Sequence, residues 1–244
     1  MRERLDTRLV ALGLAASREK AQRLILAGSV RVNGQLAHKP SEQINESAAI
    51  LVEAAEKFVS RGGHKLDAAL DAFAIPIQNA ICVDIGASTG GFTDCLLQRG
   101  AVRVHAVDVG KGQLDWKLRN DSHVVIHDEV NARHLTAADI GEPADIVTVD
   151  VAFISLTKIL PAAVTVLKPG GILVALIKPQ FEAGKKDVKK GGVVRNSAVH
   201  DRVKEEISNF AAQTLGLRPL GAVIESPLLG PAGNKEFLAA WRKP

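Results

Sequence analysis

Short apolar runs alternate with longer mixed segments over most of the chain. The runs have the length of buried β-strands, and the candidates are Ile81–Ile85, Val102–Val107, His123–Ile126, Ile146–Val149, Ile172–Ile177 and Leu220–Ile224. Helical spacing fills the intervals, for example Phe92–Arg99 and Leu156–Leu167, and a helix over Lys65–Phe73 precedes the first strand. Apolar strands that alternate with helices are typical of a parallel sheet covered on both faces. The pattern therefore predicts an α/β fold.

The first 60 residues follow a different pattern of short helices and hairpin strands. The predicted elements are a helix with Leu5, Leu9 and Leu12 on one face, a helix over Arg18–Ala27, and strands at Val30–Val32, Gln35-Leu36 and Ile50–Val52. Asn33-Gly34 predicts a type I′ turn between two of these strands. Charged residues and a glycine pair within Ala54–Gly63 indicate a boundary. We therefore expect a small α+β domain at residues 1–58 and a larger α/β domain at residues 59–244.

Composition narrows the class of protein. The chain has 244 residues, two cysteines and no tyrosine, and its longest strongly apolar stretch, Ile172–Ile177, is far shorter than the ~18 residues of a membrane span. The N-terminal residues contain no apolar signal core, and two cysteines cannot form a disulfide framework or a zinc site by themselves. We expect a cytoplasmic protein without a membrane, metal or obligate protein partner.

The positive charge is concentrated in two segments. The formal net charge of +4 alone is weak evidence for any partner. However, Met1 to Lys39 contains eight basic and three acidic residues, and Pro179 to Lys204 contains seven and three. Between them, Ala80 to Lys178 contains nine basic and eleven acidic residues. Two basic segments around a slightly acidic middle favour a nucleic-acid partner.

The small domain resembles the S4 RNA-binding domain. The matching blocks are Arg4-Leu5-Asp6, Ser17–Ala21 and Ile25–Gly34. The resemblance implies binding of structured RNA, including ribosomal RNA, through a basic face. The candidate RNA-binding residues are Arg4, Arg18, Lys20, Arg23, Arg31 and, at the domain boundary, Arg61. The alternative is a small helical cap that binds no ligand.

A turn of small residues, Asp84–Gly91, joins the first strand of the larger domain to its first helix. A dinucleotide-binding turn would need glycine in place of Ser88. Gly86-Ala-Ser-Thr-Gly90 also has the spacing of a hydrolase nucleophile elbow, with Asp150 and His200 as possible partners of Ser88. That elbow, however, belongs several strands into its sheet. In a third interpretation, the turn resembles the cofactor turn of class I methyltransferases.

The third resemblance implies a Rossmann-like class I S-adenosylmethionine-dependent methyltransferase domain. Small residues let the backbone approach the methionine part of the cofactor, and Asp108 ends the second strand, where it can bond the ribose. Asp128 or Asn131 lies where such folds contact the adenine. The alternatives are that Asp128 is an ordinary surface acid and that Asn131 caps a helix. The candidate cofactor-binding residues are Asp84, Gly86, Ala87, Ser88, Gly90, Gly91, Phe92, Asp108, Asp128, Asn131 and Asp150.

Two further strands end in an ionisable residue, Asp150 and Lys178. Ligands bind outside the carboxyl ends of parallel strands, so we expect both side chains to face the crevice at Gly86. A buried ion pair that only closes the sheet is the alternative, although burying such a pair rarely gains much stability. Methylation of a hydroxyl needs a group that orients it and removes its proton. Lys178 is the candidate base, Asp150 its partner and Lys65 a second cation.

Seven blocks resemble the TlyA, or hemolysin A, family of ribosomal RNA methyltransferases, which join an S4 domain to an FtsJ-like catalytic domain. They are Val59–Leu66, Asp84–Asp94, Ala106–Gly110 with Gly112–Leu114, Phe153–Leu156, Ile177–Glu182, Gly191–Arg195 and Gly230–Glu236. The resemblance implies 2′-O-methylation of cytidine in ribosomal RNA by a catalytic set that falls on Lys65, Asp150, Lys178 and Glu236. Glu225 competes with Glu236 for the last place.

The end of the chain at Pro244 favours large-subunit RNA, because family members that modify both subunits tend to be longer. The basic segment Lys185–Arg195 is expected to form a mobile loop over RNA or cofactor, or else a surface loop without a ligand. Two other classes stay open, a non-catalytic RNA-binding protein and a membrane-active hemolysin. The intact cofactor turn opposes the first, and the lack of a long apolar or strongly amphipathic stretch opposes the second.

Overall fold

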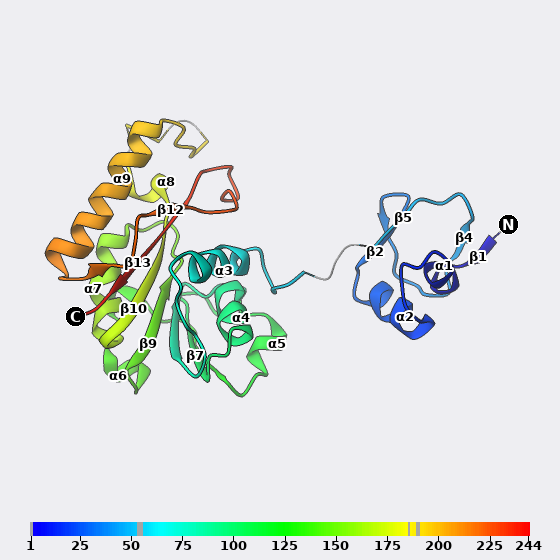
Figure 1. Cartoon of the computed structure of the whole chain (residues 1–244), viewed down its shortest axis with the longest axis horizontal. Helices are drawn as coiled ribbons and strands as arrows, with labels where there is room; N and C mark the ends of the chain where they lie inside the picture. The colour runs from blue at the N-terminus through cyan, green and yellow to red at the C-terminus, as the bar shows by residue number, and fades with distance from the viewer. Residues whose placement is uncertain (1, 53–55, 185, 189–190) are drawn as a thin grey trace. The chain divides into compact units, whose positions relative to one another are not determined.

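Separate hydrophobic cores divide the chain into two units, Met1–Lys57 and Phe58–Pro244. The structure is a computed structural model that describes residues 2–52, 56–184, 186–188 and 191–244 (Figure 1). Ala54 and Ala55 of the expected boundary, and Lys185, Lys189 and Lys190 of the expected mobile loop, lie outside the described residues.

The described residues of unit 1 form two short helices and two small antiparallel sheets. Its elements are β1 (Arg2–Arg4), α1 (Leu5–Ala11), α2 (Arg18–Leu26), β2 (Val30–Val32), β3 (Gln35–Leu36), β4 (Gln43–Asn45) and β5 (Ile50–Val52). The strands pair as β3-β2-β5 and β1-β4. Ser17 caps α2 by accepting a hydrogen bond from Lys20 N at 3.2 Å. Asn33 and Gly34 both have positive φ, at 51° and 81°, as a type I′ turn requires.

Unit 2 is built on an eight-stranded, mostly parallel sheet, which confirms the predicted α/β class. The strands follow the order β11-β13-β10-β9-β6-β7-β8, and β12 pairs with β13. They are β6 (Ile81–Ile85), β7 (Arg103–Val107), β8 (Val124–His127), β9 (Ala144–Val149), β10 (Leu167–Ile177), β11 (Arg218–Pro219), β12 (Ile224–Glu225) and β13 (Phe237–Arg242). The helices are α3 (Gly62–Ala72), α4 (Gly91–Gln98), α5 (Trp116–Arg119), α6 (Ala137–Ile140), α7 (Leu160–Val166), α8 (Pro179–Glu182) and α9 (Ser197–Asn209).

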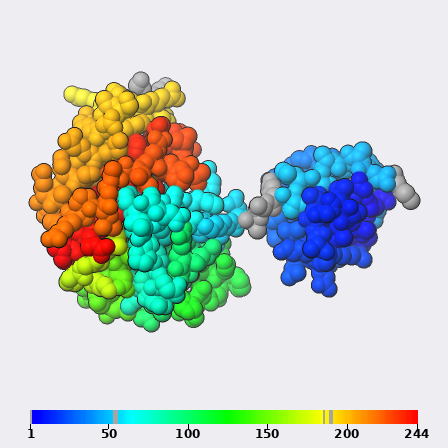
Figure 2. All heavy atoms as spheres, viewed as in Figure 1, coloured from blue at the N-terminus to red at the C-terminus, as the bar shows by residue number. Residues whose placement is uncertain are grey.

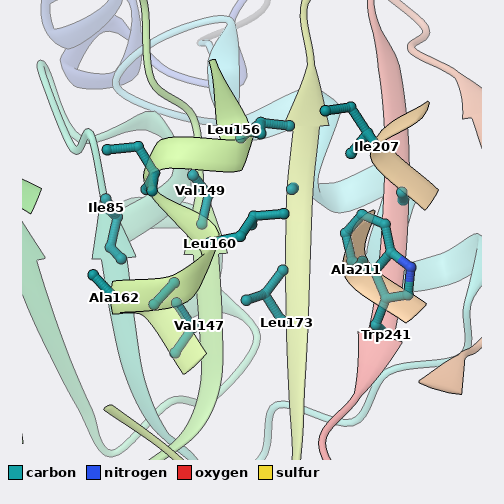
Figure 3. Packing of buried hydrophobic residues seen from close by; sticks show 14 of the residues in the cluster. Ile85, Val147, Val149, Leu156, Leu160, Ala162, Leu173, Ile207, Ala211 and Trp241 are labelled. Atoms are coloured by element: carbon teal, nitrogen blue, oxygen red, sulfur yellow. The ribbon is translucent and has the colours of Figure 1, made fainter. Parts of the chain in front are cut away.

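Helices cover both faces of the sheet, with α7 and α9 on one side and α3 and α4 on the other (Figure 1). Alternate residues of each strand enter opposite cores. On β10, for example, Leu173 packs towards α7 and α9, while Val174 packs towards α3 and α4. Figure 3 shows the first of these cores, in which Leu160 of α7 and Trp241 of β13 are both fully buried. Burying one such side chain stabilises the fold by roughly 1.5–3 kcal/mol. The packed cores therefore hold the carboxyl ends of the strands in fixed positions.

At one edge of the sheet, a predicted strand is mostly wrong and another strand was not predicted. Of the strand expected over Leu220–Ile224, only Ile224 lies in a strand. β13 was not predicted, and it runs antiparallel to β10 with Phe237 opposite Ile177. This reversed strand matters for the site, because its first residue lies at the same edge as the last residues of the parallel strands.

Candidate active site and RNA interface

The turn after β6 is held against the ends of two neighbouring strands. Gly86 N and Ala87 N both donate to Val107 O, at 2.8 and 3.1 Å, and Asp150 N donates to Ile85 O at 2.9 Å. Gly86 has a φ of +86°, and a Cβ there would collide with the Asp150 carbonyl oxygen. The turn therefore needs glycine at this position.

Asp84 lies beneath this turn and lines neither of the cavities beside it. Its carboxylate is fully buried and accepts hydrogen bonds from the hydroxyls of Thr93, at 2.7 Å, and Thr148, at 2.9 Å. Burial raises the pKa of Asp84 to about 6, despite these two hydrogen bonds. Any contribution of Asp84 to cofactor binding would therefore be indirect, through the shape of the turn.

A cavity of about 630 Å³ opens on one side of the turn, within the usual size of ligand sites. Asp108 lies in its wall, and the carboxylate accepts from Ser88 N at 2.8 Å and from Gly110 N at 2.7 Å. Asn131 also lines the cavity, while its Oδ1 caps a short helix by accepting from Arg133 N. Asp128 is not among the lining residues, because its carboxylate turns to Gly112 N and Arg119.

This cavity suits an adenosine moiety. Its wall combines a fixed carboxylate, Asp108, which can accept from ribose hydroxyls, with the apolar side chains of Val109, Val130 and Ile154. Gly86 and Ser88 of the turn also belong to the wall. The carboxylate acceptor, the apolar wall and the size therefore fit S-adenosylmethionine.

A second cavity of about 320 Å³ adjoins the first, and both share Gly86, Ser88, Asp150 and Ala152. Two ion pairs line it. Lys178 Nζ lies 2.6 Å from Asp150 Oδ1, and Lys65 Nζ lies 2.5 Å from Glu236 Oε2. The four side chains are largely removed from water, with exposed fractions of 14%, 20%, 10% and 0% in that order. We call this the acceptor cavity.

Glu236 reaches the acceptor cavity because it directly precedes the antiparallel strand β13. Figure 2 shows the chain near α3, in cyan, beside the orange and red C-terminal segment. The second carboxylate oxygen of Glu236, Oε1, is buried and has no hydrogen-bond partner among the described residues. Glu225, the competing candidate, is instead half exposed and pairs with Lys235 at 3.0 Å.

Of the other predicted residues of the turn, some line the acceptor cavity and one packs inside the protein. Gly91, Phe92 and Ala87 line the acceptor cavity, and so does Arg61, which is exposed at the start of α3. Gly90 has a φ of +97° and packs against the side chains of Leu114 and Leu118. Arg61 thus belongs to unit 2 and lines the acceptor cavity, whereas the other candidate RNA-binding residues belong to unit 1.

A hydrolase triad is not assembled. The Ser88 hydroxyl donates to Gln113 Oε1 at 3.4 Å, and Asp150 pairs with Lys178. His200 lines a different cavity, where its Nε2 donates to Val194 O at 2.9 Å. The hydrolase interpretation is therefore wrong.

In unit 1, one buried acid holds two of the five predicted basic residues, Arg4 and Arg18. The fully buried Asp6 accepts from Arg4 at 2.8 and 3.0 Å, from Arg18 at 3.0 Å and from Gln22 at 2.9 Å. These bonds, that of Arg4 above all, hold the pKa of Asp6 well below its usual range despite burial. Lys20 and Arg23 lie exposed on α2.

Arg31 projects from β2 and donates to Gly34 O at 3.4 Å. Sequence reasoning identified these cations but not the role of Asp6, although the acid lies in one of the quoted blocks. It also missed Leu228 and Leu229, which line the acceptor cavity, and it gave no role to Pro231 of the block Gly230–Glu236, which lines the same cavity. Their only signal was the proximity of a glycine- and proline-rich loop to Glu236.

No helix of the described residues is long and apolar enough to cross a membrane. Nor do the described histidine, cysteine and acidic side chains gather into a group of three that could hold a metal ion.

Known proteins match both units. Residues 58–243 match the FtsJ-like methyltransferase family, and residues 3–50 match the S4 domain. A 16S/23S rRNA (cytidine-2′-O)-methyltransferase, TlyA, from Mycobacterium tuberculosis is 48% identical over 97% of this chain and 88% of its own length. A 23S rRNA (cytidine-2′-O)-methyltransferase from Campylobacter jejuni is 30% identical over 93% of the chain and 95% of its own. The solved structure of a candidate hemolysin from Streptococcus thermophilus covers 99% of this chain and is itself covered to 88%, with 43% identity and a TM-score of 0.75.

Proposed function

This chain belongs to the TlyA family of ribosomal RNA methyltransferases, and on that premise we propose that it methylates the ribose 2′-hydroxyl of a cytidine in ribosomal RNA. The observation that carries the proposal is the pair of adjoining cavities. One has the wall of a nucleoside site, and the other presents two lysine–carboxylate pairs to the same turn. The acceptor ribose would enter the second cavity.

The cofactor would be held by the first cavity. Asp108 would accept from the ribose hydroxyls, Asn131 would lie near the adenine, and the backbone of Gly86 and Ser88 would face the methionine part. S-adenosylmethionine supplies a methyl group on a sulfonium, which is already a strong electrophile. The protein therefore has to align the acceptor and remove one proton.

The acceptor cavity contains groups for both tasks. Asp150 holds Lys178 Nζ in place by the 2.6 Å contact. Lys178 would orient the 2′-hydroxyl and, as the neutral amine, would take its proton when the oxygen attacks the methyl group. Lys65 adds a second positive charge, held by Glu236. A buried acceptor without a partner is costly, so Glu236 Oε1 is available to a hydroxyl of the entering ribose.

An aromatic ring at the rim supports an RNA substrate. Phe153 is 89% exposed, lies in the wall of the cofactor cavity and has a φ of +63°, a conformation that is unfavourable for a large side chain. Its ring contacts that of Phe181, with centroids 5.1 Å apart. An exposed ring can stack on a nucleobase, and we propose that role for Phe153.

The proposed RNA lies in the large subunit, because the relatives from Mycobacterium tuberculosis and Campylobacter jejuni are both 23S rRNA methyltransferases, the first a 16S rRNA methyltransferase as well. Purified large and small subunits, each lacking the modification, would be incubated with methyl-labelled cofactor and the full chain. Label on a cytidine ribose of the large-subunit RNA is the expected result. Label on a base, or RNA binding without any transfer, would refute the proposed reaction, and the second result would favour a non-catalytic RNA-binding protein.

A further inference from the structure

A third cavity, of about 480 Å³, lies next to the acceptor cavity and is not used by the proposed reaction. Leu229 belongs to the walls of both cavities and separates them. The remaining wall comes from two loops, at residues 193–195 and 232–235, and from the first turn of α9 at Ser197 and His200. The lining residues are Val193, Val194, Arg195, Ser197, His200, Leu229, Ala232, Gly233 and Lys235.

Buried polar side chains hold the two loops together. Asn234 is 1% exposed, and both ends of its amide bridge the loops: Oδ1 accepts from Val194 N and Nδ2 donates to Gly192 O, each at 2.9 Å. His200 holds the same loop by donating to Val194 O. Because Asn234 is two residues from Glu236, these bonds also fix the cavity relative to the proposed catalytic carboxylate.

The cavity has an apolar floor and a basic rim. Val193, Val194, Leu229 and Ala232 supply the apolar surface. Arg195 is exposed at the rim and makes no ion pair or side-chain hydrogen bond with the residues that the structure describes. Lys235 is the second cation, and Glu225 pairs with it at 3.0 Å.

We propose that this cavity is a subsite for the nucleotide next to the methylated one. Arg195 binds the phosphate that joins the two nucleotides, and the neighbouring base lies on the apolar floor. A free guanidinium suits a phosphate because it can donate two parallel hydrogen bonds, and the shared wall at Leu229 places the site one step along the strand from the acceptor ribose. This inference rests on the proposed function.

The test compares Arg195→Ala with Arg218→Ala. Arg218 is also exposed, but it lies on β11, opposite Arg242 in the strand register. Arg242 is the last residue of β13 and Phe237 is the first, so Arg218 lies at the end of β13 away from the site. Methyl transfer to large ribosomal subunits would be measured over a range of subunit and salt concentrations. For Arg195→Ala we expect KM to rise about tenfold, kcat to stay near wild type, and the salt dependence of binding to weaken by about one phosphate contact. Arg218→Ala should behave as wild type.

Equal behaviour of the two variants would overturn the subsite. So would a loss of kcat without a change in KM, since Arg195 would then act on the reacting groups. If the wild-type protein transfers no methyl group to either subunit, the proposed function itself fails, whatever the variants do.

Discussion

Both units bury an aspartate completely, and they balance its charge in opposite ways. Asp6 in unit 1 is surrounded by two arginines and an amide, which lower its pKa. Asp84 in unit 2 has two neutral threonine hydroxyls, and its pKa is raised to about 6. A buried aspartate therefore holds cations in unit 1, whereas in unit 2 it lies beneath a turn of small neutral residues and is bound by neutral hydroxyls.

The difference follows the proposed division of labour. The arginines bound to Asp6 remain partly exposed, at 38% and 57%, so they can still face a polyanion. In unit 2, the cations Lys65 and Lys178 are enclosed and paired with their own carboxylates. Cations for binding lie in water, and cations for chemistry lie in a cavity. Changes in unit 2 should therefore alter the rate of transfer, and changes in unit 1 should alter affinity for RNA.

The largest effect is expected for Lys178→Met. Removing the proposed base should lower kcat by about 10³-fold, in the middle of the range for a general base, while cofactor binding measured by equilibrium dialysis stays near wild type. Lys168→Met is a matched control, because Lys168 also pairs with an aspartate, Asp145, but near the opposite end of β10. A variant of Lys178 that retains full turnover would remove the distinction between the two units.

The second largest effect is expected in the pH dependence of the stability of unit 2, to which Asp84 contributes. Because its pKa in the folded state, about 6, exceeds the ordinary value of 3.8, the folded protein keeps a proton that the unfolded chain loses. Stability should therefore fall as pH rises from about 4 to 6, by on the order of 3 kcal/mol, and stay level above that. Asp84→Asn should lack this fall. Both tryptophans, Trp116 and Trp241, lie in unit 2, so their fluorescence follows its unfolding. Parallel pH curves for the variant and wild type would contradict the account.

Asp6→Asn should show the opposite pH dependence. With its pKa lowered in the folded state, Asp6 contributes stability above its ordinary value, and this contribution is lost as pH falls below about 4. At pH 7 the variant should destabilise unit 1 by about 2 kcal/mol, the cost of losing charge-assisted hydrogen bonds to a buried group. Hydrogen exchange at the amides of α2 measures this directly. A difference from wild type that persists undiminished in acid would show that the arginines do not matter.

The smallest effect is expected for the double variant Lys20→Ala, Arg23→Ala. Both side chains are exposed on α2, so the fold should be unaffected. RNA affinity should fall about tenfold, with a weaker dependence on salt because phosphate contacts are lost. Filter binding with large-subunit RNA at several salt concentrations provides the measurement. The pair Lys158→Ala, Arg218→Ala, exposed in unit 2, is the control.

Local structure could be predicted well where one segment contains the whole signal. The bounds of β6 and the turn at Asn33-Gly34 agree with the pattern, because strand hydrophobicity and turn chemistry are local properties. The antiparallel direction of β13 could not be predicted, because it depends on how this segment meets β10 at the edge of the folded sheet. Glu236 was therefore identified through family resemblance, and its contact with Lys65 only through the structure.

The site residues divide in the same way. Asp84 and Cys82 are two residues apart on β6, and both turn towards α4, away from the face of Val83 and Ile85. Strand alternation indicates this, whereas the position of Asp84 at a strand end suggested the cofactor. The bridge formed by Asn234 is non-local, joining residues about 40 positions apart. No pattern within either loop predicts it.

Single-turnover kinetics can show whether unit 1 binds RNA while unit 2 performs the transfer. Enzyme in excess over large ribosomal subunits would be mixed with labelled cofactor, and the rate would be followed to saturation. We expect the double variant Lys20→Ala, Arg23→Ala to reach the wild-type rate at a higher enzyme concentration, whereas Lys178→Met should transfer almost no methyl group at any concentration. A double variant that stays slow at saturation, or a Lys178 variant rescued by more enzyme, would contradict this expectation.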